Sequence, residues 1–318
     1  MMILILLGAG AYVGWNIGAN DTANCVGTTV GCGLISYKRA VILVSIFVLL
    51  GSLVDGDHVM KTVGRGIINQ PLDYLAIFVA LMCSGIFVTL ATFYSIPTST
   101  SQAIVGGILG IGLATGAQIQ YSKLITIAES WVLCPILVLA LSYGFYSLLI
   151  QFIKRLRVAS LMLQNTLGWL SIMSSCYLAY SMGANNAGNA VGPIANLGIV
   201  NPQILLLIGG ISIAVGAMTY GKKVADTVGK GITPLDIPAA FSAQLSSAAG
   251  MHMFSLLGIP VSTSSAIVGA IVGVGLVKGA KSISKKTILT ILAGWVLTPT
   301  CAAVTSLVMY KILKTFVF

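Results

Sequence analysis

The chain reads Gly18-Ala19-Asn20-Asp21-Thr22-Ala23-Asn24-Cys25-Val26-Gly27 near its beginning, which places one carboxylate and two carboxamides inside otherwise apolar sequence. A second stretch follows 165 residues later and reads Gly183-Ala184-Asn185-Asn186-Ala187-Gly188-Asn189-Ala190-Val191-Gly192, with six of ten positions identical. A polar cluster that recurs in each half of an apolar chain is better explained as two halves of one binding site than as two accidents.

The composition is that of an integral membrane protein. Of the 318 residues, 57% are hydrophobic and 8% are charged, and the mean hydropathy is +1.00, which excludes a soluble globular domain. A net charge of +10 would suggest a nucleic-acid partner in a soluble protein. Here the Lys and Arg residues lie between apolar segments, where they set the orientation in the membrane. We therefore expect the chain to lie in a lipid bilayer and to bind no nucleic acid.

Ten apolar runs are candidates for membrane segments, because about 20 residues cross the hydrocarbon core of a bilayer. The first half contains five runs, at 1–19, 39–55, 72–95, 98–117 and 122–152. The second half also contains five, at 165–184, 203–221, 235–257, 261–279 and 287–313. The apolar stretch 25–36 after the first run suggests that the first run of each half is a broken helix.

Four motifs recur in the same order in both halves and identify a duplicated unit. Besides the Gly-Ala-Asn stretch, residues 62–67 recur at 227–232, residues 97–106 at 260–269, and residues 131–135 at 295–299. Basic residues link the two copies, so we divide the chain into a first transmembrane repeat, 1–157, and a second, 158–318. An odd number of crossings per copy would insert the second copy upside down, as in many secondary transporters.

The basic residues test this inversion. Five crossings per copy would put 12 Lys and Arg residues on one side of the membrane and 5 on the other. By the positive-inside rule the side with 12 is cytoplasmic. The sequence thus predicts a multi-pass protein of the cell membrane with both termini outside.

Asp21 indicates a cation site, because burying a carboxylate is expensive unless a cation, a proton or several donors lie beside it. Asn20 and Asn24 would share one face of a helix, but the glycines around them make a local break an equal alternative. A break would free backbone carbonyls, and these, with Asp21 and the carboxamides, would form an oxygen shell suited to sodium. The competing interpretation is a tight contact between helices at small residues.

A second pair of motifs indicates an anion site. Pro97-Thr98-Ser99-Thr100-Ser101-Gln102 and Pro260-Val261-Ser262-Thr263-Ser264-Ser265 each lie between two apolar runs, in a turn without charge. Proline followed by Ser and Thr is typical of a helix N-terminus, where free N–H groups, hydroxyls and the helix dipole favour a tetrahedral oxyanion. The alternative is ordinary N-caps on two surface hairpins. If both hairpins are re-entrant, inversion would point the two helix starts at each other near the membrane midplane.

The other polar residues give weaker evidence of a functional role. His58, in a predicted loop, and His252, in an apolar run, are expected to be structural. Asp73 and Asp236 match across the repeat at the starts of their helices and are expected to be caps. A membrane-embedded enzyme would want paired carboxylates, or a base beside a metal cluster. Asp21 is the single acid in the repeated motifs and neither histidine lies in them, so we expect no enzymatic activity.

These motifs resemble those of the inorganic phosphate transporter (PiT) family of sodium or proton phosphate symporters. Gly-Ala-Asn-Asp followed by Ala-Asn is similar to the signature of that family, and the Pro-x-Ser-Thr segments are similar to its second repeated motif. The resemblance implies an all-α membrane fold of two inverted-topology repeats of about five membrane segments each, with broken helices and re-entrant hairpins, and it implies a homodimer. It implies sodium ligands Asn20, Asp21, Asn24, Asn185, Asn186 and Asn189. It implies phosphate ligands Ser99, Thr100, Ser101, Gln102, Ser262, Thr263, Ser264 and Ser265.

Two departures from the family pattern bear on coupling. Asn186 stands where relatives often have Asp, which removes one negative charge and leaves the number of bound cations open. Gln102 and Ser265 stand where many relatives have His, which favours sodium over proton coupling. We therefore predict a secondary active transporter that imports inorganic phosphate by sodium symport and needs no cofactor besides the coupling ion. The alternatives are a sulfate or proton-coupled permease of the same family and an anion channel on the same scaffold.

Overall fold

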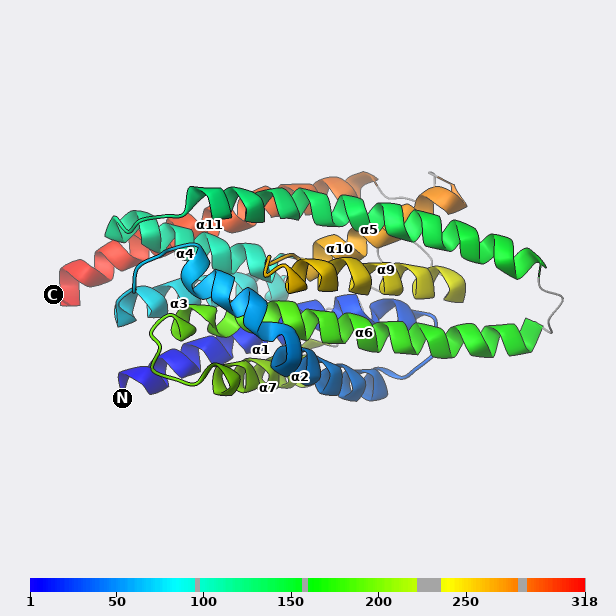
Figure 1. The fold of residues 1–318 in the computed structure, drawn as a ribbon, viewed down its shortest axis with the longest axis horizontal. Helices are drawn as coiled ribbons and strands as arrows, with labels where there is room; N and C mark the ends of the chain where they lie inside the picture. Colours follow the sequence, from blue (N-terminus) through cyan, green and yellow to red (C-terminus); the bar gives the residue numbers. More distant parts are fainter. Residues whose placement is uncertain (95–97, 156–159, 222–235, 280–284, 318) are drawn as a thin grey trace.

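The computed structural model of the chain describes residues 1–94, 98–155, 160–221, 236–279 and 285–317. The helices run along one long axis, as Figure 1 shows. In the first half they are α1 (Met2–Gly31), α2 (Tyr37–Lys61), the π-helical turn η1 (Thr62–Gly66), α3 (Tyr74–Phe93), α4 (Thr100–Thr115) and α5 (Tyr121–Arg155). In the second half they are α6 (Ser160–Ala195), α7 (Pro202–Thr219), α9 (Ile237–Leu256), α10 (Thr263–Lys278) and α11 (Lys285–Val317).

Each of the ten predicted apolar runs coincides with one of these helices, so the prediction of an all-helical membrane protein is confirmed. Within the described ranges, six helices are long and apolar enough to cross a membrane. By contrast, α4 and α10 have 16 residues each. At 1.5 Å per residue such a helix is shorter than the hydrocarbon core of about 30 Å.

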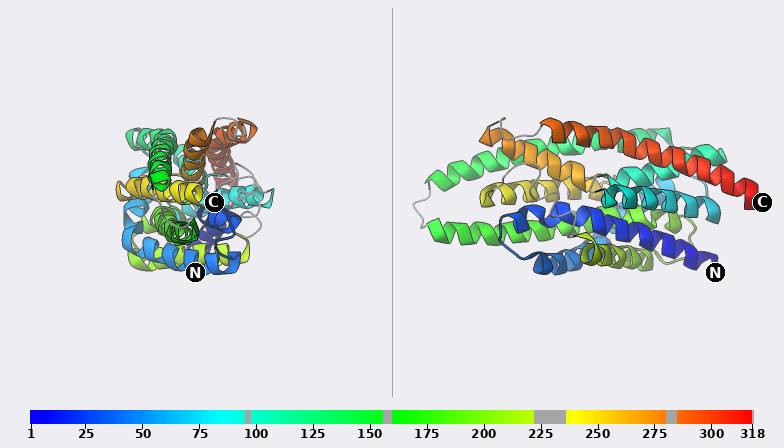
Figure 2. Two further views of the ribbon diagram at one scale, coloured as in Figure 1. Left: turned by 90° about the vertical axis from the view of Figure 1, so that its right-hand side faces the viewer. Right: turned by 180° about the vertical axis from the view of Figure 1, so that it is seen from behind.

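The two short helices are the second legs of hairpins. The hairpin α3–α4 enters from the end of the molecule that holds both termini, and the hairpin α9–α10 enters from the opposite end (Figures 1 and 2). Each hairpin turns back near the middle of the long axis. Asp73 caps α3 by accepting the N–H of Ala76 at 2.6 Å, and Asp236 caps α9 by accepting the N–H of Ala239 at 3.0 Å. Both acids therefore act as caps, as predicted.

The halves of the chain interlock and exchange partners. α1 packs against α7 while its counterpart α6 packs against α2, and α4 packs against α11 while its counterpart α10 packs against α5. Figure 1 shows that α1 and α6 begin at opposite ends of the molecule, as do α5 and α11. Corresponding helices thus run in opposite directions. The predicted boundary between 157 and 158 lies outside the described residues, as do Pro97, Arg157 and the second copy of the motif at 227–232.

One expectation about the helices is corrected. α1 and α6 run as continuous α-helices through both Gly-Ala-Asn stretches, so the break expected in the first run of each half is absent from these two described helices. The glycines instead admit neighbouring backbone. A Cβ at Gly18 would overlap the carbonyl oxygen of Ile213, and one at Gly183 would overlap that of Val48. These glycines therefore form tight contacts between helices, as the competing interpretation stated. The polar side chains of the same stretches do not take part in these contacts at Gly18 and Gly183.

A second correction concerns His58, which lies in the last turns of α2 and not in a loop. Its side chain is exposed. The sequence around it, with two aspartates and a glycine, is polar enough to imitate a loop.

Candidate functional site

The polar residues of the two Gly-Ala-Asn stretches lie in the C-terminal halves of α1 and α6 and are buried. Six side chains belong to this group: Asn20, Asp21, Asn24, Asn185, Asn186 and Asn189. Asp21 is 1% exposed, and its Oδ2 accepts hydrogen bonds from the hydroxyl of Thr100 at 2.8 Å and from Nδ2 of Asn186 at 3.4 Å. The two copies of the motif therefore meet at Asp21 and Asn186.

The Ser/Thr segments form the beginnings of α4 and α10, and they too are buried. Ser99 is the N-cap of α4 and accepts the N–H of Gln102 at 3.2 Å, and Ser262 is the N-cap of α10 and accepts the N–H of Ser265 at 3.1 Å. The ordinary-cap interpretation thus holds for these two serines. The hairpins do not lie on the surface, however, because the described residues of both tips are buried.

The two hairpin tips touch each other. The hydroxyl of Ser101 donates to the carbonyl of Val261 at 2.8 Å, and the hydroxyl of Ser264 donates to the carbonyl of Thr98 at 3.3 Å. Each tip thus uses a serine to bind the backbone of the other. The structure therefore brings the starts of α4 and α10 together, as the repeat predicted.

Asn186 connects both hairpins to both central helices. Its Nδ2 donates to the hydroxyl of Thr263 at 3.0 Å. Its Oδ1 accepts from the hydroxyl of Ser101 at 3.1 Å and from Nδ2 of Asn189 at 3.0 Å. Asn189 also reaches Ser101 at 2.8 Å. One buried network therefore joins predicted cation ligands to predicted anion ligands.

Asn20 and Asn185 occupy equivalent places but contact the first legs and loops of the hairpins. Asn20 donates to the hydroxyl of Thr92 on α3 at 2.9 Å, and Asn185 donates to the hydroxyl of Ser255 on α9 at 3.0 Å. Asn185 also accepts the N–H of Val261 at 3.2 Å. These asparagines hold the hairpins in place beside the network.

Several buried atoms in the predicted site residues have no hydrogen-bond partner. They are Asp21 Oδ1, Asn189 Oδ1, Gln102 Oε1 and Nε2, and Ser265 Oγ. An unsatisfied buried polar group costs about 1–3 kcal/mol, so such groups in a native protein call for a ligand or water. The two Oδ1 atoms are acceptors suited to a hard cation, whereas the amide and hydroxyl hydrogens of Gln102 and Ser265 are donors suited to an anion.

Sequence reasoning missed a second polar cluster beside the site. Gln244 on α9 donates to the carbonyl of Cys25 at 3.0 Å and to the hydroxyl of Thr29 at 2.6 Å, and it accepts from Ser174 at 3.2 Å. It also missed the partners Thr92 and Ser255. These two match across the repeat, so comparing the two hairpins residue by residue would have found them.

Comparisons with known proteins identify the family and the fold. The model of a family described as the phosphate transporter family matches residues 17–306. A protein of Pyrococcus furiosus, assigned as a phosphate permease, is 32% identical over 98% of this chain and 96% of its own length. The inorganic phosphate transporter 2-1 of the chloroplast of Arabidopsis thaliana is 26% identical over 91% of this chain and 68% of its own length. A solved structure described as the sodium-dependent phosphate transporter is 27% identical, with a TM-score of 0.89 over 99% of both chains.

Proposed function

The chain belongs to the phosphate transporter family, and on that premise we propose that it is a secondary active transporter that imports inorganic phosphate together with sodium. The similarity to a sodium-dependent phosphate transporter supports the choice of sodium. The contacts that carry the proposal join the two kinds of site: Thr100 and Ser101 begin α4 and bind Asp21 and Asn186.

We place the sodium site at Asp21 and Asn189. Asp21 supplies the single negative charge of the two repeated motifs, and one of its oxygens and one of Asn189 are buried without a partner. Sodium is a hard cation that prefers oxygen ligands. Asn186 would orient both side chains through the hydrogen bonds described above, and Asn20, Asn24 and Asn185 complete the predicted set of asparagines.

We place the phosphate site between the first turns of α4 and α10. The first N–H groups of a helix have no partner within the helix, and its N-terminus carries a partial positive charge. Two such termini face each other here, and Gln102 and Ser265 add buried donors without partners. Four more hydroxyls would have to turn toward the anion: those of Thr100, Ser101, Thr263 and Ser264. In this structure they form hydrogen bonds with Asp21, with Asn186 or with the backbone of the other hairpin. Ser99 and Ser262 would act as caps that fix the two termini.

Coupling would follow from charge. A cation beside Asp21 neutralises the carboxylate and lowers the cost of bringing an anion to α4, while the anion in turn favours the cation. Because Thr100 touches Asp21 and belongs to the first turn of α4, a change at one site reaches the other through a single side chain. Rocking of the two repeats, 1–157 and 158–318, would then alternate access to the site.

Orientation and assembly complete the proposal. The excess of Lys and Arg on one side supports a cytoplasmic location for that side, and hence a cell-membrane protein with both termini outside. Both termini lie at the same end of the molecule (Figure 1), which this topology requires. The homodimer rests on the family resemblance.

Uptake of labelled phosphate into proteoliposomes tests the proposal. We expect concentrative uptake under an inward sodium gradient and none with potassium in its place. Uptake should persist in excess unlabelled sulfate. Uptake that follows a proton gradient would overturn the sodium assignment, uptake abolished by sulfate would overturn phosphate selectivity, and equilibration without accumulation would indicate a channel.

A further inference from the structure

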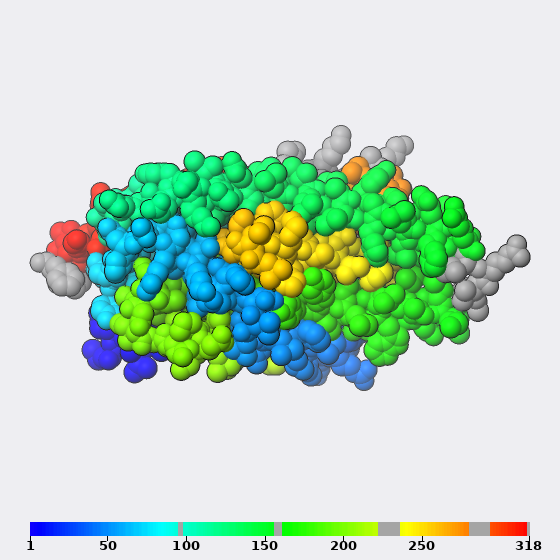
Figure 3. All heavy atoms as spheres, in the orientation of Figure 1, coloured from blue at the N-terminus to red at the C-terminus, as the bar shows by residue number. Residues whose placement is uncertain are grey.

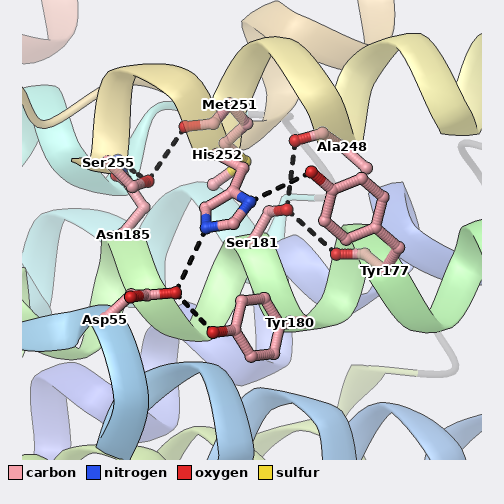
Figure 4. Close-up of polar contacts among 9 residues, drawn as sticks. All are labelled: Asp55, Tyr177, Tyr180, Ser181, Asn185, Ala248, Met251, His252 and Ser255. Atoms are coloured by element: carbon pink, nitrogen blue, oxygen red, sulfur yellow. Dashed lines mark hydrogen bonds and ion pairs between the residues drawn. The ribbon is translucent and has the colours of Figure 1, made fainter. Parts of the chain in front are cut away.

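A second group of ionisable side chains lies outside the proposed transport site, where α2, α6 and α9 meet (Figure 4). Asp55 of α2 accepts a hydrogen bond from the hydroxyl of Tyr180 of α6. His252 of α9 places Nε2 at 3.2 Å from the same carboxylate oxygen of Asp55 and Nδ1 at 3.0 Å from the hydroxyl of Tyr177 of α6. The rings of both tyrosines lie edge-on to the imidazole, at centroid distances of 5.7 and 5.4 Å.

The group is poorly accessible to solvent. The side chain of His252 is 20% exposed and that of Asp55 is 17% exposed. Histidine is the side chain that ordinarily changes its charge between pH 5 and 8. A neutral imidazole with its proton on Nε2 would donate to Asp55 and accept from Tyr177. A protonated imidazole would turn the contact with Asp55 into an ion pair, which is a stronger hydrogen bond. The same geometry therefore accommodates both protonation states.

The position of His252 gives this contact a mechanical consequence. His252 lies in the first leg of the hairpin α9–α10, three residues before Ser255, which accepts a hydrogen bond from Asn185. Asn185 in turn binds the tip of that hairpin at Val261. The loop after α9 also packs on α2, because a Cβ at Gly258 would lie 2.9 Å from the carbonyl oxygen of His58. The ion pair would thus fasten the hairpin to α2, close to the proposed anion site.

The other half of the chain has the same group without a histidine or an acid. At the positions that correspond through the repeat stand Tyr12, Trp15, Thr89 and Tyr220. The hydroxyl of Tyr12 lies 2.5 Å from that of Thr89, and the ring of Trp15 lies 6.2 Å from that of Tyr220. This group connects α1 with α3 in the hairpin α3–α4. Of the two groups, the one at the hairpin α9–α10 therefore contains a contact between an imidazole and a carboxylate.

We propose that Asp55 and His252 form a proton-binding latch that fastens the hairpin α9–α10 to α2 and slows phosphate transport when it is protonated. The transport half of this inference rests on the proposed function. The ionisable groups that face His252 are Asp55 from α2 and Tyr177 and Tyr180 from α6. α1, α5 and α10 also pack on α9. In their described parts no ionisable side chain forms a hydrogen bond or ion pair with His252, and Lys278 of α10 instead pairs with Asp236, the N-cap of α9, at 3.1 Å.

A spectroscopic experiment tests the proton site without requiring transport. The chain has two histidines, so a His58→Gln variant leaves His252 as the sole source of imidazole NMR signals. We expect the chemical shifts of this imidazole, recorded in lipid nanodiscs, to change with pH and the change to differ in the Asp55→Asn variant. A signal that does not titrate, or that titrates identically without Asp55, would overturn the proposal. His252 itself stays in place in both variants, and the thermal midpoint of each variant shows whether it is folded.

A transport experiment tests the latch. The ratio of phosphate uptake at pH 8 to that at pH 6 should be about five-fold larger in the parent chain than in His252→Gln. The reason is that the ion pair stabilises the closed latch by about as much as one hydrogen bond does, and this corresponds to a factor of about five in an equilibrium constant. Protonation of phosphate itself affects both proteins equally. Tyr12→Phe, in the neutral group of the other half, is the matched control and should keep the parental ratio.

The experiments can disprove the latch and the proposed transport function separately. Equal ratios in the parent chain and His252→Gln would overturn the latch even if sodium-dependent uptake is present. If phosphate uptake is missing at every pH while the His252 titration still depends on Asp55, the proposed function fails and the proton site stands.

Discussion

Removing the charge of Asp21 should abolish the response of the transporter to sodium. The Asp21→Asn substitution is nearly isosteric, and an asparagine oxygen can still accept the hydrogen bond that Thr100 donates at 2.8 Å. The residue is 1% exposed and one of its carboxylate oxygens has no partner. The substitution therefore tests the charge itself and leaves the packing of α1 in place.

The size of the effect follows from the burial. Two opposite unit charges 4 Å apart attract each other by about 4 kcal/mol at an effective dielectric constant of 20. Because every 1.4 kcal/mol is a factor of ten in affinity, the loss corresponds to an affinity for sodium about a thousand-fold weaker. The sodium concentration for half-maximal uptake should rise by about the same factor, so stimulation should vanish at the sodium concentrations that saturate the parent protein.

The assay is phosphate uptake as a function of sodium concentration, with potassium keeping the ionic strength constant. A charge-swapped variant, Asp21→Asn together with Asn186→Asp, is the matched control, because Nδ2 of Asn186 lies 3.4 Å from the carboxylate of Asp21. It restores one negative charge at the neighbouring position, so we expect part of the sodium response to return. Undiminished stimulation by sodium in the Asp21→Asn variant would refute the assignment.

Three further predictions, one of them with a control substitution, separate binding from stability. Gln102→Leu should raise the KM for phosphate about ten-fold without lowering the thermal midpoint, since the amide has no partner to lose and its burial without one is unfavourable; an unaltered KM would remove this residue from the anion site. Gly183→Ala should destabilise the protein by about 3 kcal/mol, because its Cβ would overlap the backbone of α2, whereas Gly144→Ala, with open space around it, should be neutral or slightly stabilising; equal thermal midpoints would contradict this packing. Asn185→Ala should cost about 1–3 kcal/mol by leaving a buried N–H at the tip of α9–α10 unsatisfied; thermal unfolding measures it, and a smaller loss would mean that the tip is held by other contacts.

The repeated motifs made most of the fold predictable. Apolar runs of the right length located ten helices, and matching Asp73 with Asp236 predicted two caps that the structure contains. The repeat also predicted that the starts of α4 and α10 would meet if both hairpins were re-entrant, because inversion would then point the two copies at each other. The helix propensities of the residues did not decide whether Gly18 and Gly183 break their helices or allow close contacts with neighbouring helices. Glycine permits both a helix break and a close helix contact, and the partner helix decides between them.

Side-chain partners were less predictable than helices. The sequence selected Asp21 and Asn186 as a matched pair, but it did not show that Asn20 and Asn185 bind the hairpin legs instead. That distinction depends on rotation about the helix axis, which a single stretch of sequence leaves open. His252 was expected to be structural because it has no ligand-like neighbours along the chain. Its partner Asp55 lies 197 positions away, and the sequence of neither helix indicates that the two residues meet.

Coupled movement of the two ions is the central claim, and uptake of radioactive sodium into proteoliposomes tests it most directly. We predict that phosphate added outside increases sodium uptake and that the increase disappears in the Asp21→Asn variant, because each ligand favours binding of the other. Sodium uptake that is unaffected by phosphate, while phosphate itself still enters, would contradict the account.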